Sequence, residues 1–208
     1  GKKMVDWTQF DAVQLVTYTL FVFWQPMPMT SAERKFYRDQ SGNLPIYARL
    51  PTYVFPLVWF VLHVCLVAGM TLFAKWTVDG DHWVWRTVWS LFYINVLASK
   101  LWTFLFFTMK WGWMSLANAI FLMATALAMT ICVVIGRDNV LPDPYWAVPF
   151  SLFLVYTIWL TYAVLLTATW LFKLPEMRET PKQMLDTVKT MEQQIRMSRQ
   201  IHHTVKEK

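Results

Sequence analysis

The hydrophobic positions of this chain fall into long runs separated by short polar segments. Five runs each hold about 20 or more mostly apolar residues, enough for an α-helix to cross the roughly 30 Å hydrocarbon core of a bilayer. Turn-forming Gly, Pro, Asp and Asn residues are concentrated between the runs. Apolar residues do not alternate with polar ones over segments of about ten, as the strands of a membrane barrel would require. The predicted transmembrane helices are Phe10–Met29, Thr52–Trp76, Val84–Phe107, Trp113–Ile135 and Tyr145–Phe172.

Beyond Leu174 the pattern changes to that of a charged amphipathic helix. Its apolar residues recur at alternating spacings of four and three, which places them on one narrow face. About thirty residues are too few to bury a core, so this face is expected to contact a partner helix or the membrane surface. We therefore predict a transmembrane domain over residues 1–174 and an amphipathic tail over 175–208. The tail residues expected to contact a partner are Met184, Val188, Met191 and Ile195.

The composition agrees with a membrane protein. Hydrophobic residues make up 56% of the 208 positions, charged residues only 15%, and thirteen residues are tryptophan. A soluble domain of this length could not bury so much apolar surface. The predicted fold class is all-α, an integral membrane bundle of five transmembrane helices with a C-terminal amphipathic helical extension. We expect membrane lipids as partners and no nucleic acid. Because the chain opens with Gly rather than Met, a removed organelle transit peptide is compatible with it, and we expect a mitochondrial membrane.

The third predicted helix carries a mixed polar and aromatic stripe. Spacings of four, four, three and four place five residues on one face. An amide without a partner is costly at membrane depth, so this face must turn toward other helices or toward a ligand cleft. Hydrogen bonding between helices and ligand binding both remain open. The stripe consists of Leu91, Asn95, Ser99, Trp102 and Phe106.

Lys100 lies next to this stripe, near the middle of the same predicted helix. A lysine at the centre of a membrane helix costs about 2.5–3.5 kcal/mol on insertion scales. Lys100 is therefore expected to reach the interface, to pair with an acid, or to face another protein. Asp11 is the best acidic candidate within the chain, and a partner chain is the alternative.

His63 is the only one of the four histidines that lies within a predicted span. A haem held between two histidines needs a second one at matching depth, so such a site is excluded. The chain also lacks a phosphate loop, paired carboxylates, zinc-ligand spacing and a nucleophile elbow. We therefore predict that the protein is not an enzyme, with no catalytic and no metal-binding residue.

Four stretches of the sequence resemble one known family. The second predicted helix contains "YVFPLVWFVLHVCLVAG", with Pro51, Tyr53, Phe55, Pro56, Val58, Trp59, Leu62 and His63. The third contains Asn95, Ser99, Trp102, Phe106 and Phe107, and "KWGWMSLAN" follows with Lys110, Gly112, Trp113 and residues 115–118. The fifth contains Pro149, Phe150, Phe153, Leu160 and Thr161, with an alternative alignment on Pro144 and Tyr145. Over Phe10 to Phe172 the chain resembles the translocator protein, or tryptophan-rich sensory protein, family (TspO/MBR).

The polar positions depart from the family pattern more than the apolar ones do. Histidine stands at 63 where the family usually has tyrosine, asparagine at 95 for glutamine, and serine at 99 for asparagine. Asn118 replaces an aspartate and Thr161 an asparagine. This implies a retained fold with weakened or altered ligand recognition, because placed polar groups fix ligand orientation. The ligand-binding residues that the resemblance implies are Trp59, His63, Asn95, Ser99, Trp102, Trp113, Asn118, Phe153 and Thr161.

Two functions follow as expectations. The first is binding or translocation of a hydrophobic ligand in a cleft between the helices, the candidates being a tetrapyrrole such as a porphyrin or haem, a sterol or a lipid. The alternative is a non-catalytic accessory subunit of a large mitochondrial membrane complex, such as a respiratory-chain or ATP synthase assembly. Lys100, the altered cleft residues and the tail favour the alternative. In either case we expect protein partners through the tail helix and the lipid-facing helices, in a homodimer or a larger complex.

Overall fold

The computed structural model describes residues 10–23, 30–51, 53–77, 83–136 and 145–178, and every regular element in these ranges is helical. Two short 3-10 helices, Ile46–Ala48 and Pro175–Met177, accompany the longer elements. A π-helical turn, Phe104–Thr108, extends α4. The longer helices are α1 (Phe10–Phe23), α2 (Ser31–Ser41), α3 (Val54–Trp76), α4 (Trp83–Thr103), α5 (Gly112–Gly136) and α6 (Ala147–Lys173).

Four of the described helices are long and apolar enough to cross a membrane. They are Pro56–Lys75, Trp83–Thr108, Gly112–Gly136 and Ala147–Lys173, and they match the second to fifth predicted spans. The all-helical, integral membrane character is thereby confirmed. The first predicted span is helical over 14 residues in α1, while residues 24–29 lie outside the described part. The count of five spans therefore stays a prediction.

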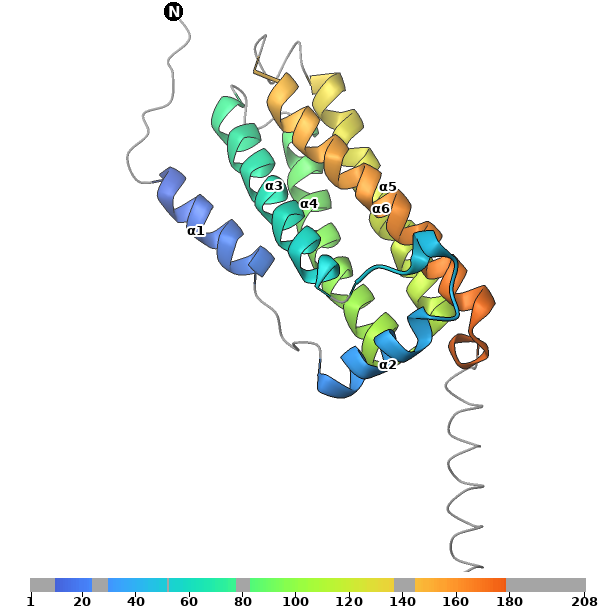
Figure 1. Ribbon diagram of the computed structural model, residues 1–208. Helices are drawn as coiled ribbons and strands as arrows, with labels where there is room; N and C mark the ends of the chain where they lie inside the picture. The colour runs from blue at the N-terminus through green and yellow to red at the C-terminus, as the bar shows by residue number, and fades with distance from the viewer. Residues whose placement is uncertain (1–9, 24–29, 52, 78–82, 137–144, 179–208) are drawn as a thin grey trace, which may run out of the picture.

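The helices pack as an elongated bundle (Figure 1). Helix α5 packs against both α4 and α6, α6 also packs against α3, and α3 packs against α1. Aromatic contacts join α1 to α4, with Tyr18 edge-on to Phe92 at 5.3 Å between ring centroids. Gly69 permits the close approach of α3 and α6, because a Cβ at this position would lie 2.8 Å from the Phe153 ring. Small residues at helix contacts are a common means of association in lipid.

The outer surface of the bundle carries many large apolar side chains. Each of the four spanning helices exposes several of them, including Phe60, Leu97, Ile131 and Ile158. In water such a surface would be unfavourable, whereas in a bilayer these side chains contact lipid. The exposed apolar surface is therefore consistent with lipid as the surrounding solvent.

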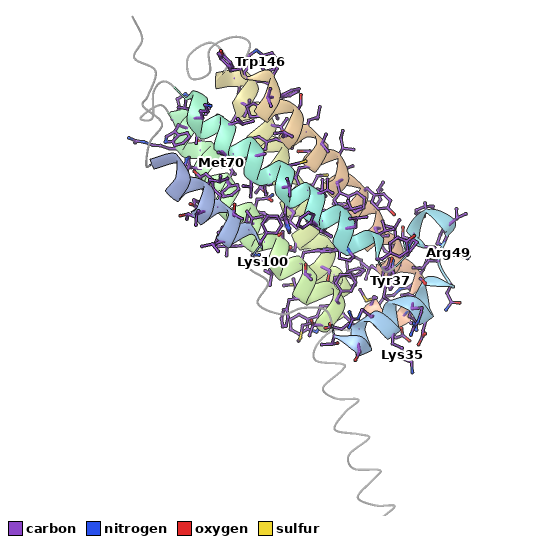
Figure 2. The ribbon with its side chains drawn as sticks, turned by 60° about the vertical axis from the view of Figure 1, so that its left-hand side comes forward. Lys35, Tyr37, Arg49, Met70, Lys100 and Trp146 are labelled. Carbon is purple, nitrogen blue, oxygen red and sulfur yellow. The ribbon has the colours of Figure 1, made fainter. Side chains whose placement is uncertain are left out.

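Helix α2 covers one end of the bundle, where the hydrophobic pattern predicts no helix. A capping box begins it: the Thr30 hydroxyl accepts from the Glu33 amide at 3.2 Å, and the Glu33 carboxylate accepts from the Thr30 amide at 2.6 Å. Tyr37 is buried and stacks on Trp170 of α6, with ring centroids 4.8 Å apart and planes 17° apart. Burial raises the pKa of the Tyr37 hydroxyl. Figure 2 shows Tyr37 at this end of the bundle, far from Trp146 at the other.

The turn between α4 and α5 also contacts α2. Lys110 has a φ of 55°, in the left-handed region, and its Nζ lies 4.0 Å above the Phe36 ring of α2. Burial raises the pKa of Glu33, but hydrogen bonds from Thr108 and Thr30 together with the Lys110 charge outweigh it, so the pKa lies below its ordinary value. The Glu33 carboxylate therefore helps to hold α2 in place.

The chain folds back onto the bundle after α6. Leu174 and Met177 are buried, and Arg178 donates from Nε to the Leu171 carbonyl at 3.2 Å. Gly112 lies directly against the Met177 carbonyl. Residues 179–208 lie outside the described part, and with them the predicted partner contacts of the tail. The division at residue 174 and those contacts stay predictions.

Candidate functional site

Asn95 is the polar centre of the bundle. It is fully buried on α4 and makes hydrogen bonds to two other helices. Its Nδ2 donates to the Leu122 carbonyl at 2.9 Å and to Thr125 Oγ1 at 2.7 Å, both on α5. Its Oδ1 accepts from the Tyr156 hydroxyl of α6 at 2.7 Å. At this position, the structure favours hydrogen bonding between helices over an open polar group for a ligand.

Three further predicted ligand-binding residues also lie in the core. Ser99 donates to the Val96 carbonyl of its own helix at 3.2 Å. Trp102 is 1% exposed, donates from Nε1 to Thr167 Oγ1 of α6 at 3.3 Å, and stacks on Phe106. Phe153 is fully buried. The polar groups of Ser99 and Trp102 therefore already have partners within the chain.

Three other predicted residues lie elsewhere on the bundle. Trp113 is 54% exposed at the start of α5 and packs edge-on against Phe172. Thr161 is exposed on α6 and donates to the Thr157 carbonyl at 3.1 Å. Asn118 is half-buried on α5, and its Oδ1 has no hydrogen-bond partner in the described part. The structure does not bring these three together with the core residues, and their ligand contacts stay predictions.

Trp59 and His63 lie close to each other on α3, with ring centroids 5.6 Å apart. Trp59 also lies 5.9 Å from Trp102 of α4, and His63 lies edge-on to Phe23 of α1 at 5.7 Å. We refer to Phe23, Trp59, His63 and Trp102 as the aromatic cluster. It joins α1, α3 and α4 through large rings.

One polar atom in the aromatic cluster is unsatisfied. His63 is 7% exposed, and its Nε2 has no hydrogen-bond partner in the described part of the chain. A buried polar atom without a partner is unfavourable and uncommon in folded proteins, so it points to a missing partner. Asn118 of α5 also has an unpartnered Oδ1, but His63 has the rings of Phe23 and Trp59 beside it, so Trp59 and His63 form the best candidate binding site among the nine predicted residues.

Lys100 has a partner that the sequence analysis did not consider. Its side chain is half-buried, and Nζ donates to the backbone carbonyl of Val22 at 3.0 Å. Val22 lies in the last described turn of α1. Figure 2 shows Lys100 beside this end of α1. The side chain of Asp11, the predicted acidic partner, lies outside the described part.

Several residues that build the site were not singled out from the sequence. Thr125 and Thr167 supply the partners of Asn95 and Trp102, and Tyr18 anchors α1 on α4. Each is a polar or aromatic residue within an apolar run, which is a weak signal in a chain with many such residues. Only the packing of the helices shows which of them meet.

The comparison with known families agrees with this architecture. A model described as the TspO/MBR family matches residues 40–172, nearly two thirds of the chain. The matched segment extends from the end of α2 through α6 and includes Trp59, His63 and all four apolar helices. No curated protein matches the chain. The chain belongs to the TspO/MBR family.

Proposed function

We propose that this protein binds a hydrophobic ligand against the aromatic cluster between α1, α3 and α4. The observation that supports the proposal is the buried, unpartnered Nε2 of His63 among the rings of Phe23, Trp59 and Trp102. Aromatic faces provide stacking area, and a single placed polar atom orients a ligand. A tetrapyrrole, a sterol and a lipid are the ligand classes that membership of the family favours.

The proposed role is binding or translocation and involves no covalent chemistry. Helix α1 is described over 14 residues, and it covers His63 through Phe23. A ligand that reaches His63 would therefore displace or share the contacts of α1. Asn95, Thr125 and Tyr156 are engaged with each other in the core, so we assign the recognition to the aromatic cluster.

The test is a titration of the purified full chain with protoporphyrin in lipid nanodiscs, followed by quenching of tryptophan fluorescence. We expect saturable quenching, and an affinity weakened about two- to tenfold in Trp59→Leu, because a stacked ring contributes about 0.5–1.5 kcal/mol. Trp113→Leu is the matched control, since Trp113 is exposed on α5, away from the aromatic cluster. Trp102→Ala is unsuitable because Trp102 is a core residue.

Absence of saturable quenching would contradict ligand binding. Equal weakening in the Trp59 and Trp113 variants would place any binding outside the aromatic cluster. Circular dichroism of each variant distinguishes a lost site from a lost fold.

The second candidate function is a non-catalytic accessory subunit of a larger membrane assembly, which we place in a mitochondrial membrane. A different observation favours it: Asn95, Tyr156 and Thr125 use their polar groups to join α4, α5 and α6. Because these polar groups bond to one another and leave no open group for a ligand, they suit a rigid scaffold. Mild-detergent extraction of the native membrane tests this candidate. A particle far larger than the 24.6 kDa chain or its dimer would support it, and a monomer or homodimer would contradict it.

A further inference from the structure

Most of the described Lys and Arg residues lie at the end of the bundle that α2 covers. Six of them are exposed there, against two exposed acids, Asp39 and Glu176. Figure 2 shows Lys35 and Arg49 at this end, far from Trp146 at the other. The six cations are Arg34, Lys35, Arg38, Arg49, Lys173 and Arg178.

The opposite end of the bundle does not share this excess of positive charge. Its exposed cations in the described part are Lys75, near the end of α3, and Arg86, near the start of α4. Three segments adjoin this end in the sequence: 1–9 precedes α1, 78–82 joins α3 to α4, and 137–144 joins α5 to α6. Together they hold three cations and five acids. The charges at the opposite end are therefore balanced, and only the α2 end is basic.

Helix α2 turns a basic face away from the bundle. At about 100° per residue, Arg34, Lys35 and Arg38 fall within an arc of about 100° on the helix surface. The other side carries Phe36 and Tyr37, which pack on the turn after α4 and on α6. Figure 1 shows α2 running across the end of the bundle rather than along it. The packing of the two aromatic rings therefore holds the three cations outward.

Exposed aromatic rings surround the bundle at the same end. Tyr47 is 56% exposed, Tyr53 before α3 is 69% exposed, and Trp113 at the start of α5 is 54% exposed. The Tyr162 hydroxyl of α6 donates to the Tyr47 carbonyl at 2.6 Å, which fixes the segment before α3 against the bundle. Exposed tyrosine and tryptophan rings at the ends of membrane helices lie at the level of the lipid headgroups. The cations of the α2 end are therefore within reach of those headgroups.

We propose that the α2 end of the bundle binds the headgroups of anionic phospholipids. Each Lys or Arg near a membrane surface contributes about fivefold to the attraction of anionic lipid. Arginine also forms paired hydrogen bonds with phosphate oxygens. A zwitterionic headgroup carries its own cation next to the phosphate, so it gains less from this surface. This inference does not depend on a ligand in the aromatic cluster.

The test measures which lipid the full chain retains at its surface. The protein is reconstituted in phosphatidylcholine bilayers that contain a trace of spin-labelled phosphatidylglycerol or of spin-labelled phosphatidylcholine. Electron paramagnetic resonance separates lipid held by the protein from free lipid and gives the ratio of the two association constants. We expect phosphatidylglycerol to be preferred about two- to fivefold at low salt. The preference should fall toward one in about 1 M NaCl, where the Debye length is about 3 Å.

Two pairs of substitutions locate the preference on the molecule. Lys35→Gln with Arg38→Gln removes two charges from the outward face of α2 and should reduce the preference by half or more. Lys75→Gln with Arg86→Gln is the matched control, because it removes one lysine and one arginine at the opposite end and should leave the preference unchanged. Lys35→Arg with Arg38→Lys exchanges the two side chains while keeping their charge, and it should retain the preference.

Each alternative outcome contradicts a definite part of the proposal. Equal retention of the two lipids by the unmodified chain overturns lipid binding and leaves an acidic protein surface as the partner of this end. A preference that survives Lys35→Gln with Arg38→Gln, or that falls equally in the control pair, overturns the assignment to α2. A preference that high salt does not reduce overturns its electrostatic origin. Circular dichroism reports whether the variants keep their helices, and Lys35→Gln alone decides if the double variant does not.

Discussion

Replacing Asn95 by leucine tests whether the polar centre holds the bundle together. The side chain is fully buried and makes three hydrogen bonds that connect α4 to α5 and α6. Leucine has a similar size and no polar atoms, so the substitution removes the hydrogen bonds with little change in volume.

The expected cost follows from the partners left behind. The Thr125 hydroxyl still donates to the Phe121 carbonyl at 3.0 Å, so it keeps a hydrogen bond in the variant. The Tyr156 hydroxyl loses its acceptor in a fully buried position, which costs about 1–3 kcal/mol. Interhelical hydrogen bonds in membranes contribute about 0.6 kcal/mol each on average. We therefore expect Asn95→Leu to lower the free energy of unfolding by about 2–4 kcal/mol.

The assay is reversible unfolding in mixed detergent micelles, followed by circular dichroism. Asn118→Leu is the matched comparison: because the buried Oδ1 of Asn118 has no partner to lose, the substitution should not lower the free energy of unfolding, and it can raise it by up to about 1–3 kcal/mol. Tyr156→Phe completes a double-mutant cycle with Asn95→Leu, for which we expect a coupling energy of about 1 kcal/mol. Equal effects at positions 95 and 118, or strictly additive energies in the cycle, would refute the assigned role of Asn95.

Three further predictions concern the end of the bundle. Gly112→Ala should destabilise the folded state by about 1–3 kcal/mol, measured in the same unfolding assay, because the new Cβ would collide with the Met177 backbone. Tyr37→Ala removes a buried ring that stacks on Trp170, so it should lower the free energy of unfolding by about 3–5 kcal/mol or release α2 from the bundle. Increased hydrogen exchange confined to α2 would indicate release. Since the pKa of Glu33 is lowered in the fold, its carboxylate stabilises the docking of α2 above the ordinary value of 4.5, and this contribution is lost as the pH falls through the lowered pKa. The protection factors of the α2 amides, which compare exchange with the intrinsic rate at each pH, should therefore fall on acidification from about pH 6 to about pH 3, and less so in Glu33→Gln.

The spanning helices could be predicted because their signal lies within single segments. The predicted span 113–135 corresponds to α5, Gly112–Gly136, and the predicted span 52–76 to α3, Val54–Trp76. Long apolar runs flanked by turn residues determine both. Helix α2 was not predicted because it is short and polar, with five charged residues among its eleven. Its stability comes from the Thr30 cap and from the docking of Tyr37 on a helix more than 100 residues away in sequence.

The candidate site was predicted only in part for a related reason. The spacing of Asn95, Ser99 and Trp102 correctly indicated a face turned inward, but it could not show whether helices or a ligand meet that face. The answer depends on Tyr156 and Thr167, whose positions opposite α4 are set by tertiary packing. Every residue has a backbone carbonyl, so a sequence does not indicate which carbonyl a side chain will contact. The Val22 carbonyl could therefore not be predicted as the partner of Lys100.

The most direct test of the ligand proposal is the nitrogen resonance of His63 in the full chain, labelled with ¹⁵N at histidine and assigned with His63→Phe. The chain has four histidines, so the spectrum is simple. Saturation with protoporphyrin or with a long-chain fatty acid should shift the Nε2 signal of His63 and leave the other three unchanged. An unchanged His63 signal at saturating concentrations of both would contradict binding at the aromatic cluster.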